Sequence, residues 1–360
     1  MKHVARRTLV IVLVIVALLV VARLALPYVV KDYLNRKMDR MGDYHGHVAD
    51  VDIHLWRGAY SLGDLRIDKV DGKVPVPFFS AATTDIAISW RAITHGTVRG
   101  RVEFDHASLN FVDGGSRAPS QAGTGVDWRQ QLEGLVPIRL DEVTVHNSQV
   151  TFHNFVSHPK VDMKMTDVEA RAVNLSNADR SQGSRVADFH ATAKVLGNAP
   201  LMADARFDPL DPKLLDFTFD LRIRQIELKR LNDLARAYAR LDFAGGNGTF
   251  VMQLQARNGE LNGYAKPLLH DVKVFSWKQD VEEDKENPLQ VAWEALASGV
   301  TWLFKNHEKD QFATKVPISG RIDSKDVGAW RAVINVLHNA FVQAYTPKLE
   351  DLEPAPEKQD

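Results

Sequence analysis

Apolar and polar residues alternate one by one over many short stretches of this chain. In the stretch DFTFDLRI at 216–223, phenylalanine, leucine and isoleucine alternate with aspartate, threonine and arginine. Successive residues of a β-strand point to opposite faces of a sheet, so this pattern predicts a strand with one apolar and one charged face. Similar stretches recur along the chain, and we expect about fifteen strands. They include 51–55, 85–90, 102–111, 143–152, 161–165, 187–195, 201–207, 249–256 and 272–275.

Turn signals and changes of phase separate these stretches. Asn258-Gly259 predicts a tight hairpin, because both turn positions require a positive φ. At Arg224-Gln225 the alternation slips by one residue, which predicts a bulge or the start of a helix. The stretches VEFDHASLNF and VTVHNSQVTF are alike, and each predicts a strand, a short turn and a second strand, as in stacked hairpins, although any two amphipathic hairpins share such spacing. The matching positions are Val102 with Val143, Phe104 with Val145, Leu109 with Val150, and Phe111 with Phe152.

The longest apolar stretch lies at the N-terminus. Thr8–Val30 carries a single arginine and is long enough to cross a bilayer as a helix. Because Lys2, Arg6 and Arg7 precede it, the positive-inside rule places the N-terminus in the cytoplasm and sends the rest of the chain across the membrane. A cleaved signal peptide is the alternative, because the strictly apolar part, Leu9–Ala22, is short.

Helical periodicity and changes in composition divide the chain into regions. One face of 227–241 is apolar at helical spacing, and so are faces of two later segments within 289–345. The helix that follows the anchor is expected to end at Gly42, a suitable C-cap. The predicted regions are a cytoplasmic tip, transmembrane anchor and following helix (1–45), a first β region (46–113), a flexible loop and short helix (114–137), a main β region with a helix near 227–241 (138–280), a closing helix–strand–helix segment (281–345) and a disordered tail (346–360).

A sheet with one apolar face must cover that face with another sheet, a helix or a ligand. The predicted helices are too few to cover about fifteen strands. Two arrangements remain open: a two-sheet sandwich, or a long antiparallel sheet of stacked hairpins curled into a groove, with a few amphipathic helices. Such a groove suits acyl chains, which need apolar area rather than directed hydrogen bonds. The residues expected to face lipid are Phe217, Phe219, Leu221, Ile223, Phe250, Met252 and Leu254.

Composition narrows the classes of function. The 360 residues are 45% hydrophobic and 8% aromatic, which suits a folded protein, and the net charge of −1 gives no indication of a nucleic-acid partner. Because the chain has no cysteine, disulfides, thiolate metal sites and cysteine nucleophiles are excluded. The histidines lack the spacing of a metal site, and the motifs of nucleotide-binding loops and serine hydrolases are missing. We therefore expect no metal, no cofactor and no catalytic residue, and we do not expect an enzyme.

Several longer blocks are informative as a set. They are YVVKDYLNRKM at 28–38, HLWRGAYSLGDLRI at 54–67, VPVPFF at 74–79, IRLDEVTVHNSQVTFHN at 138–154, NGELNGYAKPLLHDVKVF at 258–275 and KDQFATKVPISGRIDSKDVGAWRAVINVLHNAFVQAY at 309–345. Together with the basic-flanked anchor, these blocks resemble the AsmA-like superfamily of bacterial envelope proteins, and most closely its short branch of domains of unknown function. The resemblance covers nearly the whole chain.

The resemblance implies a protein anchored in the inner membrane that projects a curled β-sheet groove into the periplasm. It also implies a part in moving phospholipid toward the outer membrane, and it supplies no catalytic residue. We therefore expect a single-pass, inner-membrane-anchored periplasmic protein that binds or transfers phospholipid or another acyl lipid in envelope biogenesis. The alternative is a periplasmic scaffold or assembly factor for other envelope proteins, with a self-packed sheet and no lipid. An envelope hydrolase is the third hypothesis.

Overall fold

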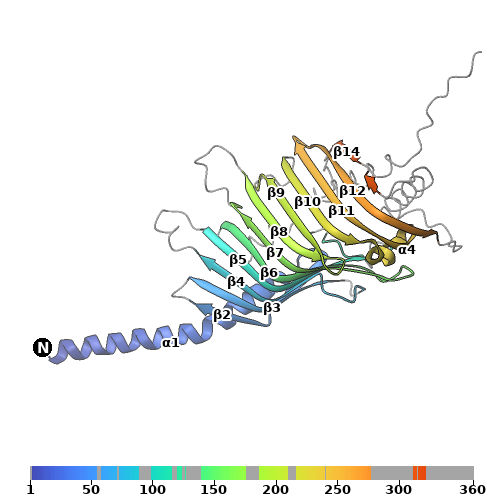
Figure 1. Cartoon of the computed structure of the whole chain (residues 1–360). Coiled ribbons are helices and arrows are strands. Elements are labelled where there is room, and N and C mark those ends of the chain that lie inside the picture. Colours follow the sequence, from blue (N-terminus) through green and yellow to red (C-terminus); the bar gives the residue numbers. More distant parts are fainter. Residues whose placement is uncertain are drawn as a thin grey trace, which may run out of the picture.

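One long β-sheet dominates the computed structural model of this chain (Figure 1). The structure describes residues 2–54, 58–70, 73–88, 99–115, 120–123, 126, 139–175, 186–209, 216–239, 241–276, 311–313 and 315–321. Its elements are α1 (Lys2–Met38), β1 (Tyr44–His47), β2 (Asp50–His54), β3 (Ala59–Lys69), β4 (Phe79–Ile88), β5 (Arg99–Asp113), β6 (Arg139–Asn154), β7 (Val161–Val173), β8 (Ala187–Val195), β9 (Ala199–Phe207), β10 (Phe217–Glu227), η3 (Leu228–Leu231), α4 (Asn232–Ala239), β11 (Leu241–Arg257), β12 (Glu260–Ser276), β13 (Gln311–Ala313) and β14 (Val316–Arg321).

The strands follow one another in the sheet almost in chain order. The 14-stranded sheet runs from β1 through β3 and β4 to β12 and β13, while β2 also pairs with β3 and β14 with β12. Among the described strands, every pair is antiparallel except β5–β6, which is parallel. A mainly β chain with one long sheet and few helices is thus confirmed. The prediction of a wholly antiparallel sheet was wrong, because β5 and β6 run in the same direction, so the long connection between them returns the chain to the end of the sheet where β5 begins.

The two self-similar stretches are strands β5 and β6, which lie side by side. Their register pairs Val102 with Val143 and Phe111 with Phe152, so the positions that match in sequence are neighbours in the sheet. The prediction of a strand, a turn and a second strand in each stretch was wrong, because both strands are continuous. His106 and Asn147 have φ angles of 51° and 49° at mid-strand, and each shifts the alternation without reversing the chain.

Left-handed residues of this kind occur in several neighbouring strands. Asp64 of β3 and Asp167 of β7 each have a φ angle of 50°, and they lie near the same level of the sheet as His106 and Asn147. Aspartate, asparagine and histidine tolerate this conformation better than most residues. Gln225 of β10, with a φ angle of 55°, produces the register shift predicted at Arg224-Gln225. Bulges bend a strand and increase its twist, so these residues shape the sheet.

Helix α1 packs against the first end of the sheet. It runs through Pro27 without interruption and ends at Met38 rather than at the predicted Gly42, which lies in the following turn with a φ angle of 66°. Leu34 and Met38 are 2% and 0% exposed in a cluster formed with residues of β2 to β5.

Polar side chains of α1 bind the backbone of the edge strand β2 and of the residues before it. Asn35 accepts a hydrogen bond from the Val48 backbone N–H (2.8 Å) and donates one to its carbonyl oxygen (3.3 Å). Lys31 donates to the Ala49 carbonyl, and Arg23 donates to the Ile53 carbonyl, both at 2.6 Å. An unpaired edge invites association with other strands, and α1 covers this one.

A short helical segment follows β10, as predicted for 227–241. Residues 228–231 form η3 and 232–239 form α4, and Leu228 and Ala235 are buried against the ends of β8, β9 and β11. The Asn258-Gly259 hairpin is confirmed between β11 and β12, with φ angles of 49° and 77°.

Other predictions fall partly or wholly on residues that the structure leaves out. Strands β13 and β14 fit the strand predicted within the closing segment, whereas the helices predicted within 289–345 and the tail at 346–360 lie outside the described residues. Of the predicted loop, Gln121 is buried and bridges Val112. The side chains of Lys2, Arg6, Arg7 and much of the predicted anchor also lie outside the described residues. Within the described residues, no helix has the length and apolar character needed to cross a membrane.

Candidate functional site: the apolar face of the sheet

One row of side chains crosses the sheet from strand to strand. Residues directly opposite each other on paired strands point to the same face. The pairing registers link β2 to β14 through one residue in each strand from β2 to β12, and Thr84 is the only member with a polar side chain. We call this the first apolar row: Val51, Leu62, Thr84, Phe104, Val145, Ala170, Ala191, Ala203, Leu221, Met252, Ala265 and Val316.

A second apolar row lies beside the first, two residues away along every strand. It carries no charged side chain on any of the same strands. Its members are Ile53, Tyr60, Ile86, Val102, Val143, Ala172, Phe189, Ala205, Phe219, Leu254, Gly263 and Ile318. The two rows form a continuous uncharged band along one face of the sheet.

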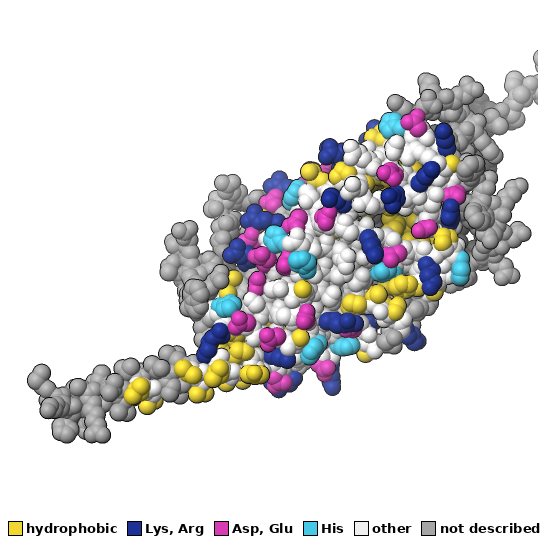
Figure 2. Space-filling model, turned by 60° about the horizontal axis from the view of Figure 1, so that its bottom comes forward, with side chains coloured by type: hydrophobic (Ala, Val, Ile, Leu, Met, Phe, Trp, Pro, Cys, Tyr) yellow, Lys and Arg dark blue, Asp and Glu magenta, His cyan; other side chains and the backbone are white. Residues whose placement is uncertain are grey.

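The residues between these two rows point to the opposite face and are mostly polar or charged. They include Asp85, Glu103, Arg171, His190, Asp204 and Asp220. Cross-strand ion pairs join this face, such as His190 Nδ1 with Asp204 Oδ1 at 2.7 Å and Arg171 Nε with Glu142 Oε1 at 2.8 Å. Figure 2 shows basic and acidic side chains interspersed over the body of the molecule. Such a surface is suited to water.

All seven residues predicted to face lipid belong to the apolar face and meet in cross-strand pairs. Phe219 lies opposite Leu254, Leu221 opposite Met252, and Ile223 opposite Phe250. The remaining one, Phe217, lies opposite Ala256 on β11 and opposite Phe207 on β9. The alternation in sequence therefore identified a real shared surface, while the contact of these residues with lipid stays a prediction.

The burial of the first apolar row changes along its length. At the α1 end, Val51 is 3% exposed and Leu62 is 1% exposed. At the far end, Ala265 and Val316 are 0% and 1% exposed. Between them the larger side chains, Phe104, Val145, Leu221 and Met252, are only half-buried. The middle of the row thus keeps apolar surface in contact with solvent.

Tyr60 reports on the environment of the covered end. It belongs to the second apolar row on β3, and burial raises the pKa of its phenol to about 12. Burial disfavours the charged phenolate, so this shift is the expected result of removing the side chain from water. The surroundings of this partly buried side chain are therefore much less polar than water.

The sequence pattern missed much of this band. Phe104, Val145 and Phe189 belong to stretches that were predicted as strands, but only β10 and β11 were singled out as a binding surface. Alanines hide the pattern in β8 and β9, where Ala191 and Ala203 occupy the first row. The signal that could have found them was the phase of alternation, which continues through the alanines.

The titratable groups form pairs on the opposite face. His146 Nδ1 lies 2.7 Å from Glu169 Oε2, and the carboxylates of Glu169, Glu103 and Asp105 raise the pKa of His146. The Asn147 backbone N–H and His146 lower the pKa of Glu169. Within the part of the chain that the structure describes, no three histidine or acidic side chains are placed to hold a metal ion. This surface offers charge pairing, whereas the apolar face offers area for a hydrophobic ligand.

Comparison with known proteins adds no assignment. No protein-family model matches the chain, and no curated protein matches its sequence. The resemblance to the AsmA-like superfamily therefore remains a prediction, and the structural indication of function comes from the geometry of the sheet.

Proposed function

We propose that this protein binds the acyl chains of lipids on the apolar face of its sheet and hands lipid along that face. The observation that carries the proposal is the uncharged band of two rows, which crosses twelve strands (β2–β12 and β14) and in whose middle larger side chains such as Leu221 and Met252 stay half-buried. The resemblance to AsmA-like envelope proteins supports a curled, groove-like sheet and a role in envelope biogenesis.

The energetics favour a flexible apolar ligand over a polar one. Removing apolar groups from water is worth about 0.8 kcal/mol for each methylene, and this gain needs no directed contact. Part of it is offset by the ordering of the ligand and of the side chains around it. An acyl chain can therefore shift along a row of Leu, Met, Val and Ala side chains while making equivalent contacts at each position.

We also propose that α1 anchors the protein in the bacterial inner membrane, with the sheet in the periplasm. The apolar side chains of Leu13, Val14, Val20 and Val21 on this helix are all more than half exposed. Figure 2 shows apolar side chains along the part of α1 that extends from the sheet. A bilayer would cover these side chains. The same helix packs Leu34 and Met38 onto the apolar face, so the anchor joins the start of the binding surface.

Site-specific photo-crosslinking in cells tests lipid binding. Benzoylphenylalanine at Met252 is expected to capture a lipid adduct, because Met252 lies on the apolar face opposite Leu221. The same group at the adjacent Gln253, which points to the polar face, is the matched control and is expected to capture none. Mass spectrometry of the cross-linked peptide identifies the adduct. Absence of lipid at Met252 would favour the scaffold hypothesis.

A substitution pair tests whether the row itself holds the ligand. In the Met252-benzoylphenylalanine background, Leu221→Asp is expected to abolish most of the adduct, because a carboxylate next to the chain must be desolvated. Asp220→Leu changes the neighbouring residue on the opposite face and is expected to leave the adduct intact. A folded Leu221→Asp protein with a full yield of adduct would contradict the proposed surface.

A fusion experiment tests whether the C-terminal end of the chain lies in the periplasm. Lys2, Arg6 and Arg7 are expected to hold the N-terminus in the cytoplasm. An enzyme that is active only in the periplasm, fused after Asp360, should therefore be active. A stably expressed but inactive fusion would refute the exported topology.

A further inference from the structure

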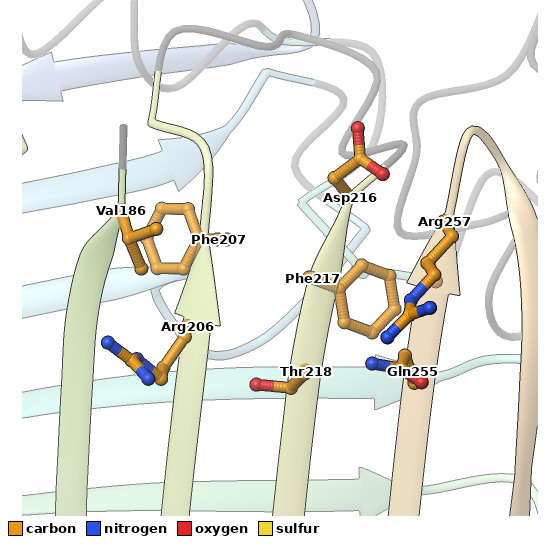
Figure 3. A pocket seen from close by; sticks show the side chains of 9 residues that line it. Val186, Arg206, Phe207, Asp216, Phe217, Thr218, Gln255 and Arg257 are labelled. Carbon is orange, nitrogen blue, oxygen red and sulfur yellow. The ribbon is translucent and has the colours of Figure 1, made fainter. Parts of the chain in front are cut away.

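One edge of the apolar face carries an open pocket of about 420 Å³ where β8 to β11 end (Figure 3). Its apolar lining comes from Phe207, Phe217 and Ala256, which are opposite one another on β9, β10 and β11. Its polar lining is formed by Arg206, Thr218, Gln255, Arg257 and Asp216. The pocket therefore lies at the rim, where the apolar and polar faces of the sheet meet.

The opposite ends of these strands are closed. Helices η3 and α4 follow directly from the last residue of β10, whereas the pocket surrounds the first residues of that strand. Leu228 of η3 and Ala235 of α4 are 1% and 0% exposed in the cluster that covers those ends. An amphiphile lying on the apolar face would therefore have its polar end at the rim that bears the pocket.

The charged side chains of the pocket differ in their hydrogen-bond and ion-pair partners. Arg206 donates through Nε to Asp188 Oδ1 at 3.0 Å, which leaves its terminal nitrogens as further donors. Asp216 uses Oδ1 to accept the backbone N–H of Asn258 at 2.9 Å. Arg257 forms no ion pair with any residue that the structure describes. Figure 3 shows its guanidinium turned toward β10, on the side of the Phe217 ring.

We infer that this rim pocket binds the anionic phosphate headgroup of a lipid through Arg257, assisted by Arg206. The inference rests on the proposed lipid-binding function and adds the position and charge of the headgroup. A guanidinium presents paired donors that match phosphate oxygens, and a charge-assisted contact of this kind is stronger than a neutral hydrogen bond. The Phe207 and Phe217 rings take up the first methylenes below the headgroup.

The chemistry favours a net negative lipid over a zwitterionic one. A choline headgroup adds a cation that Arg257 repels, while Arg206 is already paired with Asp188 and Asp216 accepts the Asn258 N–H. An anionic headgroup with a neutral polar end brings no such charge, and Thr218 and Gln255 offer hydroxyl and amide groups to it. Both lipids present the same phosphodiester to Arg257, so the repulsion of choline is what separates them, and we expect it to give about a tenfold preference between otherwise matched lipids.

The test uses the full chain incubated with vesicles of equal parts phosphatidylglycerol and phosphatidylcholine with matched acyl chains. Benzoylphenylalanine at Phe217 samples the pocket, and the same group at Met252 samples the apolar face. We expect phosphatidylglycerol adducts to exceed phosphatidylcholine adducts about tenfold at Phe217. Arg257→Gln should bring this ratio close to unity while adducts at Met252 persist. Arg222→Gln removes an exposed arginine from the polar face of β10 and should leave the ratio unchanged.

The possible outcomes distinguish a failure of the headgroup inference from a failure of the proposed lipid-binding function. No adduct at either position would overturn the proposed function and this inference with it. Adducts at Met252 combined with equal headgroup ratios at Phe217, or with no adduct at Phe217, would overturn the inference alone. A ratio that survives Arg257→Gln, or that Arg222→Gln lowers equally, would also overturn it. Circular dichroism of each variant establishes that the fold is retained.

Discussion

The apolar face has the same polarity at the α1 end and in the middle of the sheet, yet only the α1 end is closed. On β2 and β3, Val51 and Leu62 share one buried cluster with Leu34 and Met38 of α1 and are almost fully buried. On β10 and β11, Leu221 and Met252 occupy the same row and stay half-buried. The difference between core and surface here comes from what covers the row, and not from the residues in the row.

The alanines in the middle of the first apolar row limit the exposed hydrophobic surface there, because Ala191 and Ala203 are only 8% and 7% exposed. Ala170, Ala191 and Ala203 follow one another in the first apolar row on β7, β8 and β9. Alanine presents little apolar area, so this stretch exposes less hydrophobic surface than a row of leucines would. Large exposed apolar patches on soluble domains mark interaction sites or promote aggregation. A limited apolar surface can stay exposed in the absence of a ligand without causing the protein to associate with other molecules.

The largest expected effect comes from placing the same negative charge in the first apolar row at the α1 end and in the middle of the sheet. Leu62→Asp buries an unpaired carboxylate in the closed end and should lower the free energy of unfolding by about 4 kcal/mol. Leu221→Asp, on the same row, leaves the carboxylate reachable by water and should cost about 1 kcal/mol. Chemical denaturation of the two variants measures both values.

Equal losses for Leu62→Asp and Leu221→Asp would contradict the comparison, because they would mean that the middle is packed as tightly as the α1 end. Asp220→Leu serves as the reference on the polar face. It removes a partner of the Gln253 side chain, and we expect a change in unfolding free energy of less than about 1 kcal/mol.

A second prediction concerns the contact that holds the closed end together. Asn35→Ala leaves the backbone N–H and carbonyl of the buried Val48 without their side-chain partner, and should cost about 2 kcal/mol. Hydrogen exchange should become faster at the Val48 amide and in β2, while β10 and β11 stay unaffected. Arg36→Ala removes only an exposed pair with Asp32, and should cost no more than about 0.5 kcal/mol. Uniform acceleration across the sheet would show that the two regions unfold together.

A third prediction compares two bulge residues of the middle region, one in β10 and one in β6. Gln225 holds a left-handed conformation that its side chain disfavours, so Gln225→Gly should raise the free energy of unfolding by about 0.5 kcal/mol. Asn147 tolerates the same conformation and also donates to Asp105 Oδ1 at 3.0 Å, so Asn147→Gly should not stabilise the protein. Thermal unfolding of both variants measures the difference. A stabilised Asn147→Gly protein would contradict this account.

The smallest effect is expected from the pair of His146 and Glu169 on the polar face. The pKa of His146 is raised, so its contribution is complete below its ordinary value of 6.5 and is lost as the pH rises through the folded value. The pKa of Glu169 is lowered, so its contribution is complete above its ordinary value of 4.5 and is lost in acid.

The coupling between His146 and Glu169 should therefore be largest between pH 4.5 and 6.5. It should reach only a few tenths of a kcal/mol, as for exposed ion pairs generally. A double-mutant cycle with His146→Gln and Glu169→Gln, followed by unfolding across pH, measures it. A coupling that grows in alkaline solution would contradict the assignment.

Local patterns in the sequence were enough to predict most of the strands, the bulge at Gln225 and the Asn258-Gly259 hairpin. They were also enough to place Leu221 and Met252 on one face, because alternation fixes the face of each residue within a strand. These features depend on neighbours along the chain. The same reasoning misread His106 and Asn147 as turns, because a change of phase looks alike whether the chain reverses or only bulges.

Long-range pairing could not be read in the same way. No residue pattern within β5 or β6 shows that the two strands run parallel, because the relative direction of two strands depends on the connection between them. The rim pocket was missed for a similar reason. Arg206, Phe217 and Arg257 lie on three different strands, and only the register brings them together. Their residue types carry no spacing signal in the chain.

The parallel pair of β5 and β6 has a consequence for how such a chain can change in length. Strands β5 and β6 run in the same direction and carry apolar residues at matching positions. The alternation of apolar and polar residues in the strands before β5 can therefore be repeated in the strands after β6. Insertion of one further antiparallel pair on either side would lengthen the sheet by roughly 10 Å, twice the spacing between strands. Such an insertion would keep every apolar residue on its present face. Evolution could thus extend this architecture by duplication, without designing a new interior.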